Sequence, residues 1–166
     1  MSQISNYLWI FLISMVPLIE LRGAIPVAYT IKANDPSFNL LIGYIVIAVG
    51  NMLPVPIIFF FARKVLEWGA DKPVIGKFFG FCLRKGHKGG EKLQAKAGNG
   101  LFVALMLFVG IPLPGTGAWT GTLAASLLDM KFKESVLAVV CGVALAGIIV
   151  GVICSLGFGA WLGITG

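Results

Sequence analysis

The sequence has few charged side chains, a single histidine and only three cysteines among its 166 residues. Charged residues make up 12% of the chain, whereas soluble domains carry about 25%. Because 58% of the residues are hydrophobic, this scarcity of charge excludes an ordinary soluble domain and indicates a single integral membrane domain over residues 1–166. The N-terminal stretch lacks the positive flank of a cleavable signal peptide, so we expect the first apolar segment to remain in the protein.

Motifs for hydrolysis or metal binding are also missing. Cys82, Cys141 and Cys154 have no metal-ligand spacing, and His87 has no acid or cysteine beside it. The sequence contains no Ser/His/Asp set, HExxH or CxxC motif. We therefore expect no catalytic residue, no metal and no cofactor, and we do not expect an enzyme.

Four apolar segments are long enough to cross about 30 Å of hydrocarbon, at residues 8–31, 38–62, 101–128 and 135–166. The first is interrupted at Pro17–Pro26 and the third at PLPGTGAWTG, residues 112–121. Each arm beside a break has about 10 residues and reaches only about halfway across the core. Two such arms predict a re-entrant helical hairpin, and the alternative is a full-length helix with a proline kink.

The arrangement of a broken segment, a short loop and a continuous segment occurs twice, in residues 8–62 and 101–166. Nine of the thirteen Lys and Arg residues lie within the linker 63–100, which the positive-inside rule places in the cytoplasm of a cell-membrane protein. This clustering explains the net charge without nucleic acid. Re-entrant hairpins would keep Lys131 and Lys133 on the cytoplasmic side. The sequence thus predicts an all-α membrane fold of two inverted repeats, each a re-entrant hairpin followed by a transmembrane helix.

Glu20 and Arg22 lie inside the first break, where ionisable groups at membrane depth usually serve a function. Arginine presents a planar fork of donors that suits phosphate or carboxylate, and a carboxylate in a low dielectric can exchange protons. The pair therefore predicts anion binding coupled to a proton. Two alternatives are a structural ion pair that fixes the tip and a tip that reaches the aqueous interface.

The second break and one helix add further candidates. Glycines let the backbone approach closely, and successive N–H groups can form a nest for an anion. The alternative is a motif that lets two hairpins cross closely. Asn51, within GNMLPVP at 50–56, could form a wall of the same cavity or accompany a plain kink. The candidate substrate- or proton-binding residues are Glu20, Arg22, Asn51, Pro112, Pro114, Gly115, Thr116, Gly117 and Thr120.

The stretches E-L-R-G-A-I-P at 20–26 and P-L-P-G-T-G-A-W-T-G at 112–121 resemble the two signature stretches of the small multidrug export protein family. That family is similar in layout to the DedA-like superfamily, also called VTT or SNARE-associated domain proteins. Members of the superfamily are described as carrying two re-entrant hairpins, and some are implicated in proton-coupled movement of polyprenyl phosphates or other lipids. The resemblance implies roles for Glu20 and Arg22, and at the second hairpin for Pro112, Pro114, Gly115 and Gly117.

The chain departs from the DedA-like pattern because its second break carries no arginine and offers only Thr116, Trp119 and Thr120. We expect a small transporter, working as a homodimer among membrane lipids, that moves an anionic lipid such as a polyprenyl phosphate with proton coupling. The alternatives are a proton-coupled exporter of small cationic or amphipathic compounds and a scaffold that transports nothing.

Overall fold

A computed structural model describes residues 3–17, 19–70, 100–113 and 115–165. These residues are helical and include no strand, which confirms the predicted all-α class. The helices are α1 (Gln3–Met15), α2 (Glu20–Asn34), α3 (Leu40–Met52), α4 (Pro54–Ala70), α6 (Gly100–Gly110), α7 (Ala118–Leu127) and α8 (Phe132–Thr165). The basic residues from Lys72 to Lys96, His87 and Cys82 lie outside the described residues.

The first break is shorter than predicted. The chain reverses direction between α1 and α2, where Glu20 N donates to the carbonyl of Val16 at 3.0 Å, and α2 then continues through Pro26. The expectation that residues 17–26 are non-helical was therefore wrong. A proline inside a helix removes one i→i−4 hydrogen bond, but α2 packs against α1, α3 and α8 and buries Ala24, Ile25 and Ala28 completely. That packing outweighs the single lost bond.

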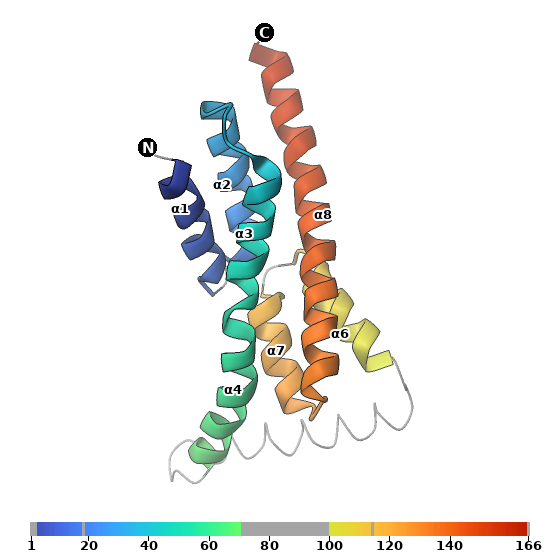
Figure 1. Cartoon of the computed structure of the whole chain (residues 1–166). Coiled ribbons are helices and arrows are strands. Elements are labelled where there is room, and N and C mark those ends of the chain that lie inside the picture. The colour runs from blue at the N-terminus through green and yellow to red at the C-terminus, as the bar shows by residue number, and fades with distance from the viewer. Residues whose placement is uncertain (1–2, 18, 71–99, 114, 166) are drawn as a thin grey trace.

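The second break lies where it was predicted but ends earlier. Helix α6 stops at Gly110, the described residues 111–113 and 115–117 are not helical, and α7 begins at Ala118, so that Gly121 is helical. In Figure 1, α1 and α6 run toward each other from opposite ends of the molecule, and both turns lie near its middle. The loops after the two helix pairs lie at opposite ends, beside the starts of α3 and α8.

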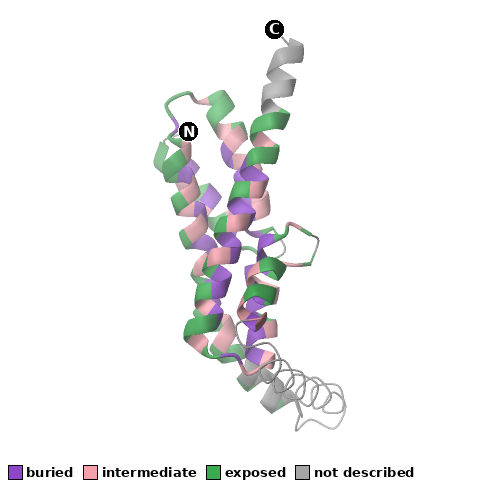
Figure 2. Ribbon diagram, turned by 90° about the vertical axis from the view of Figure 1, so that its right-hand side faces the viewer, coloured by how far each residue is buried: buried purple, intermediate pink, exposed green. Residues whose placement is uncertain are grey.

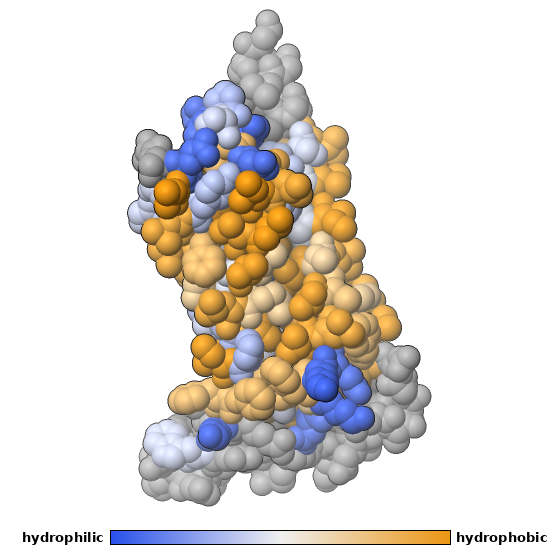
Figure 3. Space-filling model, viewed as in Figure 1, coloured by the Kyte–Doolittle hydropathy of each residue, from blue (hydrophilic) through white to orange (hydrophobic). Residues whose placement is uncertain are grey.

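Two stretches are long and apolar enough to cross a membrane, Leu40–Phe61 through α3 and α4, and Phe132–Gly157 in α8. Asn39 begins the first by accepting hydrogen bonds from Leu41 N at 3.0 Å and Ile42 N at 3.3 Å, as an N-cap does. Large apolar side chains are exposed around the bundle, and Figure 3 shows a hydrophobic band between two hydrophilic ends. These features are typical of a membrane protein.

The interior is built on close helix contacts, and Figure 2 shows the buried positions on the sides of helices that face one another. A β-carbon at Gly50 of α3 would lie 2.2 Å from Ser14 Oγ of α1. A β-carbon at Gly142 of α8 would lie 2.6 Å from Val109 Cβ of α6. Since apolar burial alone does not hold helices together in lipid, such small-residue contacts matter there. Each long helix thus packs tightly on the first arm of the helix pair that precedes it.

Candidate functional site

The two turns carry the candidate residues into contact. Glu20 is the first residue of α2 and has φ 49°, a left-handed conformation that costs a non-glycine residue about 1–2 kcal/mol. Arg22 lies two residues later in the same helix. Positions i and i+2 of a helix do not face each other, so the side chains of Glu20 and Arg22 reach different parts of the opposite tip.

The Glu20 carboxylate caps α7. It is 5% exposed, and its two oxygens accept from the backbone N–H groups of Ala118 at 3.1 Å and Trp119 at 3.0 Å. The first N–H groups of a helix have no partner within the helix, and the N-terminus carries about half a positive charge. A carboxylate from the other half of the chain therefore satisfies both the donors and the charge at this helix end.

Gly117 makes room for that carboxylate. Its φ is 147°, which L side chains rarely adopt, and a β-carbon there would lie 2.0 Å from Glu20 Oε2. Gly115 also has a positive φ, 81°, but a β-carbon there would meet nothing within 4 Å. The two glycines thus differ: Gly117 serves both the turn and the contact with Glu20, and Gly115 serves the turn alone.

The Arg22 guanidinium caps the end of α6. Its Nη2 donates to the carbonyls of Val109 at 3.1 Å and Ile111 at 3.2 Å and to Thr116 Oγ1 at 2.8 Å, while Nη1 donates to the Leu113 carbonyl. The last carbonyls of a helix are unpartnered and carry partial negative charge. Arg22 therefore supplies positive charge and several donors where α6 needs them.

The two charges do not form a direct ion pair with each other, although they lie two residues apart. In the described part of the chain, Glu20 is bonded to the α7 backbone and Arg22 to the loop after α6. Their arrangement differs from the internal ion pair that the sequence left open. Each charge instead binds the helix end of opposite sign on the other helix pair.

The other predicted residues lie around this contact in different ways. Thr116 joins it, donating to the carbonyls of Ile111 at 3.0 Å and Leu113 at 2.9 Å while accepting from Arg22. Thr120 donates to the Gly117 carbonyl at 3.5 Å and is hydrogen-bonded to neither Glu20 nor Arg22. Pro112 is half-buried in the loop, and Pro114 lies outside the described residues.

Sequence reasoning missed the groups that receive the charges. They are backbone atoms of Val109, Ile111, Leu113, Ala118 and Trp119, and a backbone group leaves no mark in residue type. The available signal was the break itself, because a proline- and glycine-rich interruption creates two bare helix ends. The expected anion nest does exist in part, and the protein's own carboxylate occupies it.

Asn51 of α3 lies beside the two charges. It is 1% exposed, and its Oδ1 is buried without a hydrogen-bond partner. Such an orphaned acceptor costs about 1–3 kcal/mol. With Glu20, Arg22 and aliphatic residues of α2, α6, α7 and α8, Asn51 lines a narrow space that is too tight for a water-sized sphere. The indole N–H of Trp119 is a second buried group without a partner.

An open groove of about 600 Å³ lies between α2, α3 and α8. Its lining includes Leu21 and Val143, which also line the narrow space beside Glu20. The lining contains no charged residue, and its polar side chains are Tyr29, Tyr44 and Ser155. The Tyr29 hydroxyl donates to the Gly151 carbonyl at 3.2 Å and is also hydrogen-bonded to Tyr44. The groove is therefore an apolar surface with a few hydroxyl groups, which is typical of ligand pockets.

Within the described ranges, no three His, Cys, Asp or Glu side chains lie close enough to hold a metal ion. The model of the family described as "Putative small multi-drug export protein" matches residues 20–149, which include both charges, the second tip and the first half of α8. The chain belongs to that family. No curated protein and no solved structure matches it.

Proposed function

We propose that this member of the small multi-drug export family exports its cargo by reorganising the contact between two re-entrant hairpins, α1–α2 and α6–α7. Their arms contain 10–15 residues, or about 15–22 Å of helix, against about 30 Å of hydrocarbon. The long stretches Leu40–Phe61 and Phe132–Gly157 measure about 33 and 39 Å. The repeated order of elements, with α1 and α6 running in opposite directions, supports two inverted repeats.

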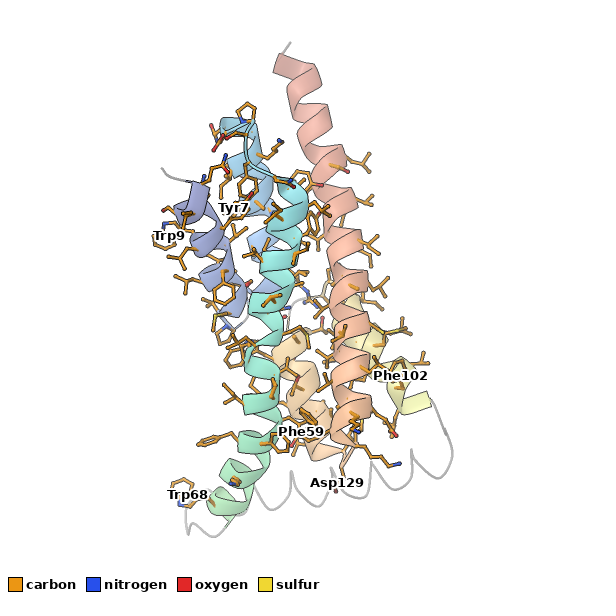
Figure 4. The ribbon with its side chains drawn as sticks, in the orientation of Figure 1. Tyr7, Trp9, Phe59, Trp68, Phe102 and Asp129 are labelled. Carbon is orange, nitrogen blue, oxygen red and sulfur yellow. The ribbon has the colours of Figure 1, made fainter. Side chains whose placement is uncertain are left out.

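The proposed placement in the membrane follows the ends of the molecule. Trp9 and Trp68, which are labelled in Figure 4, are exposed near opposite ends, as the aromatic residues of membrane interfaces are. Lys131 lies in the loop between α7 and α8, at the same end as the last turns of α4. We assign this end, with the linker 63–100, to the cytoplasm. The first hairpin then enters from outside and the second from the cytoplasm.

The contact between the tips is the coupling element in this proposal. An ionised Glu20 holds the start of α7 through two N–H groups, and a proton on either oxygen removes charge from that contact. Loss of the charge weakens the interaction with the positive helix end. Proton binding at Glu20 therefore frees α7 from α2, and proton release restores the contact. The single observation that carries the proposal is this cross-capping of one hairpin by the other.

The groove between α2, α3 and α8 is the proposed cargo site. It is apolar, has the volume of a small-molecule site and shares the lining residues Leu21 and Val143 with the space beside Glu20. Because no charged residue lines the groove, it fits a small amphipathic compound that is neutral. It also fits a cationic compound whose charge lies over the ring face of Tyr29 or Tyr44. This favours the sequence-based alternative of small-compound export over an anionic cargo.

The test uses proteoliposomes with an imposed pH gradient and a fluorescent amphiphile, in neutral and cationic forms. We expect wild type to move the amphiphile and Glu20→Gln to lose at least about tenfold in rate, as expected for a missing proton-transfer group. Glu134→Gln is the matched control, because Glu134 is an exposed acid in the first turn of α8 that pairs with Lys131 at 3.6 Å. Equal rates in wild type and Glu20→Gln would contradict the proposal.

An anionic lipid is the second candidate cargo, and the environment of Arg22 favours it. The acceptors around the guanidinium are neutral carbonyls and one hydroxyl, and charge-assisted bonds to phosphate are stronger than bonds to neutral oxygens. A headgroup that reached the tip would therefore displace them. Transbilayer movement of a short-chain polyprenyl phosphate that is lost in Arg22→Ala would favour this cargo, and no movement in wild type would eliminate it. The homodimer expected from the sequence stays a prediction.

A further inference from the structure

Asn51 is a buried polar side chain that the cross-capping contact does not use. Its Oδ1 accepts no hydrogen bond, and its side chain lines the narrow space that also contains Glu20. Buried polar groups are normally hydrogen-bonded. An unpartnered one at a candidate site therefore indicates that the protein has another state in which this group is hydrogen-bonded.

Protonation of Glu20 creates the need for such a partner. The ionised carboxylate only accepts, and the α7 backbone supplies two donors for it. A protonated carboxyl gains an O–H donor, which the N–H groups of a helix start cannot accept. Of the other residues that line the space, Arg22 only donates, and Leu21, Val109, Ala118, Val143 and Ala146 have no polar side chain.

We propose that Asn51 completes a proton-binding site with Glu20, by accepting the carboxyl O–H through Oδ1 when Glu20 is protonated. This inference rests on the proposed role of Glu20 as the proton carrier. It assigns Asn51 a positioning role that sets how tightly Glu20 binds its proton.

The charges around Glu20 are few. Arg22, on the same helix, is the one charged residue besides Glu20 that lines the space, while α1, α3, α6 and α7 contain no charged residue. The charged residues of α8 lie in its first turn, away from Val143 and Ala146. Changes at Asn51 therefore act on Glu20 without altering another charge.

The experiment is an infrared pH titration of the full chain in lipid nanodiscs, which follows the carboxylic-acid C=O band. Absence of the band in Glu20→Gln assigns it to Glu20. We expect Asn51→Leu, which keeps the size of the side chain and removes the amide, to lower the proton-binding constant about tenfold, the effect of one hydrogen bond to the neutral form. Ser14→Ala is the matched control, because Ser14 is equally buried and its hydroxyl bonds to the Phe11 carbonyl.

Two further variants, Asn51→Ser and Asn51→Ala, test the proposal even if Asn51→Leu does not fold. Asn51→Ser retains an acceptor that Asn51→Ala lacks, so Asn51→Ser is expected to bind the proton more tightly. Equal proton binding in wild type, Asn51→Leu and both smaller variants would overturn the role of Asn51 and leave proton coupling through Glu20 intact. A wild-type protein without a titrating Glu20 band would overturn both, and unchanged export by Glu20→Gln would then confirm that the proposed function has failed.

Discussion

The two tips of the molecule are opposites in chemistry. The first tip, between α1 and α2, leads directly into Glu20 and Arg22. The second tip, residues 111–117, carries no charged side chain and instead presents the bare ends of α6 and α7. One half of the chain supplies charges, and the other half supplies the helix ends that need them. Two tips of the same kind would leave either charges or backbone groups without partners.

This difference explains why an acid and a base lie two residues apart in an apolar segment. If Glu20 and Arg22 bonded to each other, they would neutralise one another and leave the ends of α6 and α7 unsatisfied, which is costly in lipid. Divided between two helix ends of opposite sign, the same pair connects the hairpins. Their spacing of two residues on α2 keeps the side chains from facing each other.

Exchanging the two charges is expected to have the largest effect on stability. In the double variant Glu20→Arg, Arg22→Glu, each charge faces a helix end of its own sign, and we expect the free energy of unfolding to fall by about 5 kcal/mol. Unfolding in mixed micelles, followed by circular dichroism, measures the loss. A variant as stable as wild type would fit the scaffold alternative with a simple ion pair and would contradict the cross-capping.

A methyl group at the second tip gives the next largest effect. Gly117→Ala places a β-carbon where the Glu20 carboxylate lies and requires an unfavourable φ, so we expect a loss of about 4 kcal/mol. Gly115→Ala is its matched control, since it meets only the backbone cost of about 1–2 kcal/mol. The same micelle assay compares the two, and equal losses would mean that Gly117 serves the turn alone.

Arg22→Lys tests whether the end of α6 needs the guanidinium group or only a positive charge. Lysine keeps the charge, but its single ammonium group cannot reach the carbonyls and the Thr116 hydroxyl together as the guanidinium fork does. We expect a loss of about 2 kcal/mol, near the value of a charged hydrogen bond. A lysine variant with wild-type stability would show that charge alone is needed at this helix end.

Thr116→Val is the smallest change. It keeps the shape of the side chain and removes the hydroxyl that bonds to Arg22 and to two carbonyls of the loop. We expect a loss of about 1 kcal/mol. Thr120→Val should cost less, because the Thr120 hydroxyl makes one long bond within α7. The reverse order of the two variants would contradict the assigned contacts.

Much of the fold could be predicted from the sequence, because apolar length and proline or glycine breaks are local signals. The helix class and the second break follow from them, and Glu20 and Arg22 stand out as charges in an apolar segment. The helical state of Pro26 could not be predicted, since it depends on the packing of α2 against three other helices. The partners of Glu20 and Arg22 are backbone groups about 90 residues away, which no residue type marks. The groove depends equally on long-range contacts, such as that of Tyr29 with Gly151.

The most direct measurement is the distance between the two tips as a function of pH. Spin labels on cysteines at Val16 and Leu113, both exposed tip residues, would report it by pulsed electron paramagnetic resonance in nanodiscs, with Cys82, Cys141 and Cys154 replaced by serine. The account predicts a short, narrow distance distribution at neutral pH and a longer, broader one at acidic pH. It also predicts that Glu20→Gln has the longer, broader distance distribution at neutral and at acidic pH. A distribution that neither pH nor Glu20→Gln alters would contradict it.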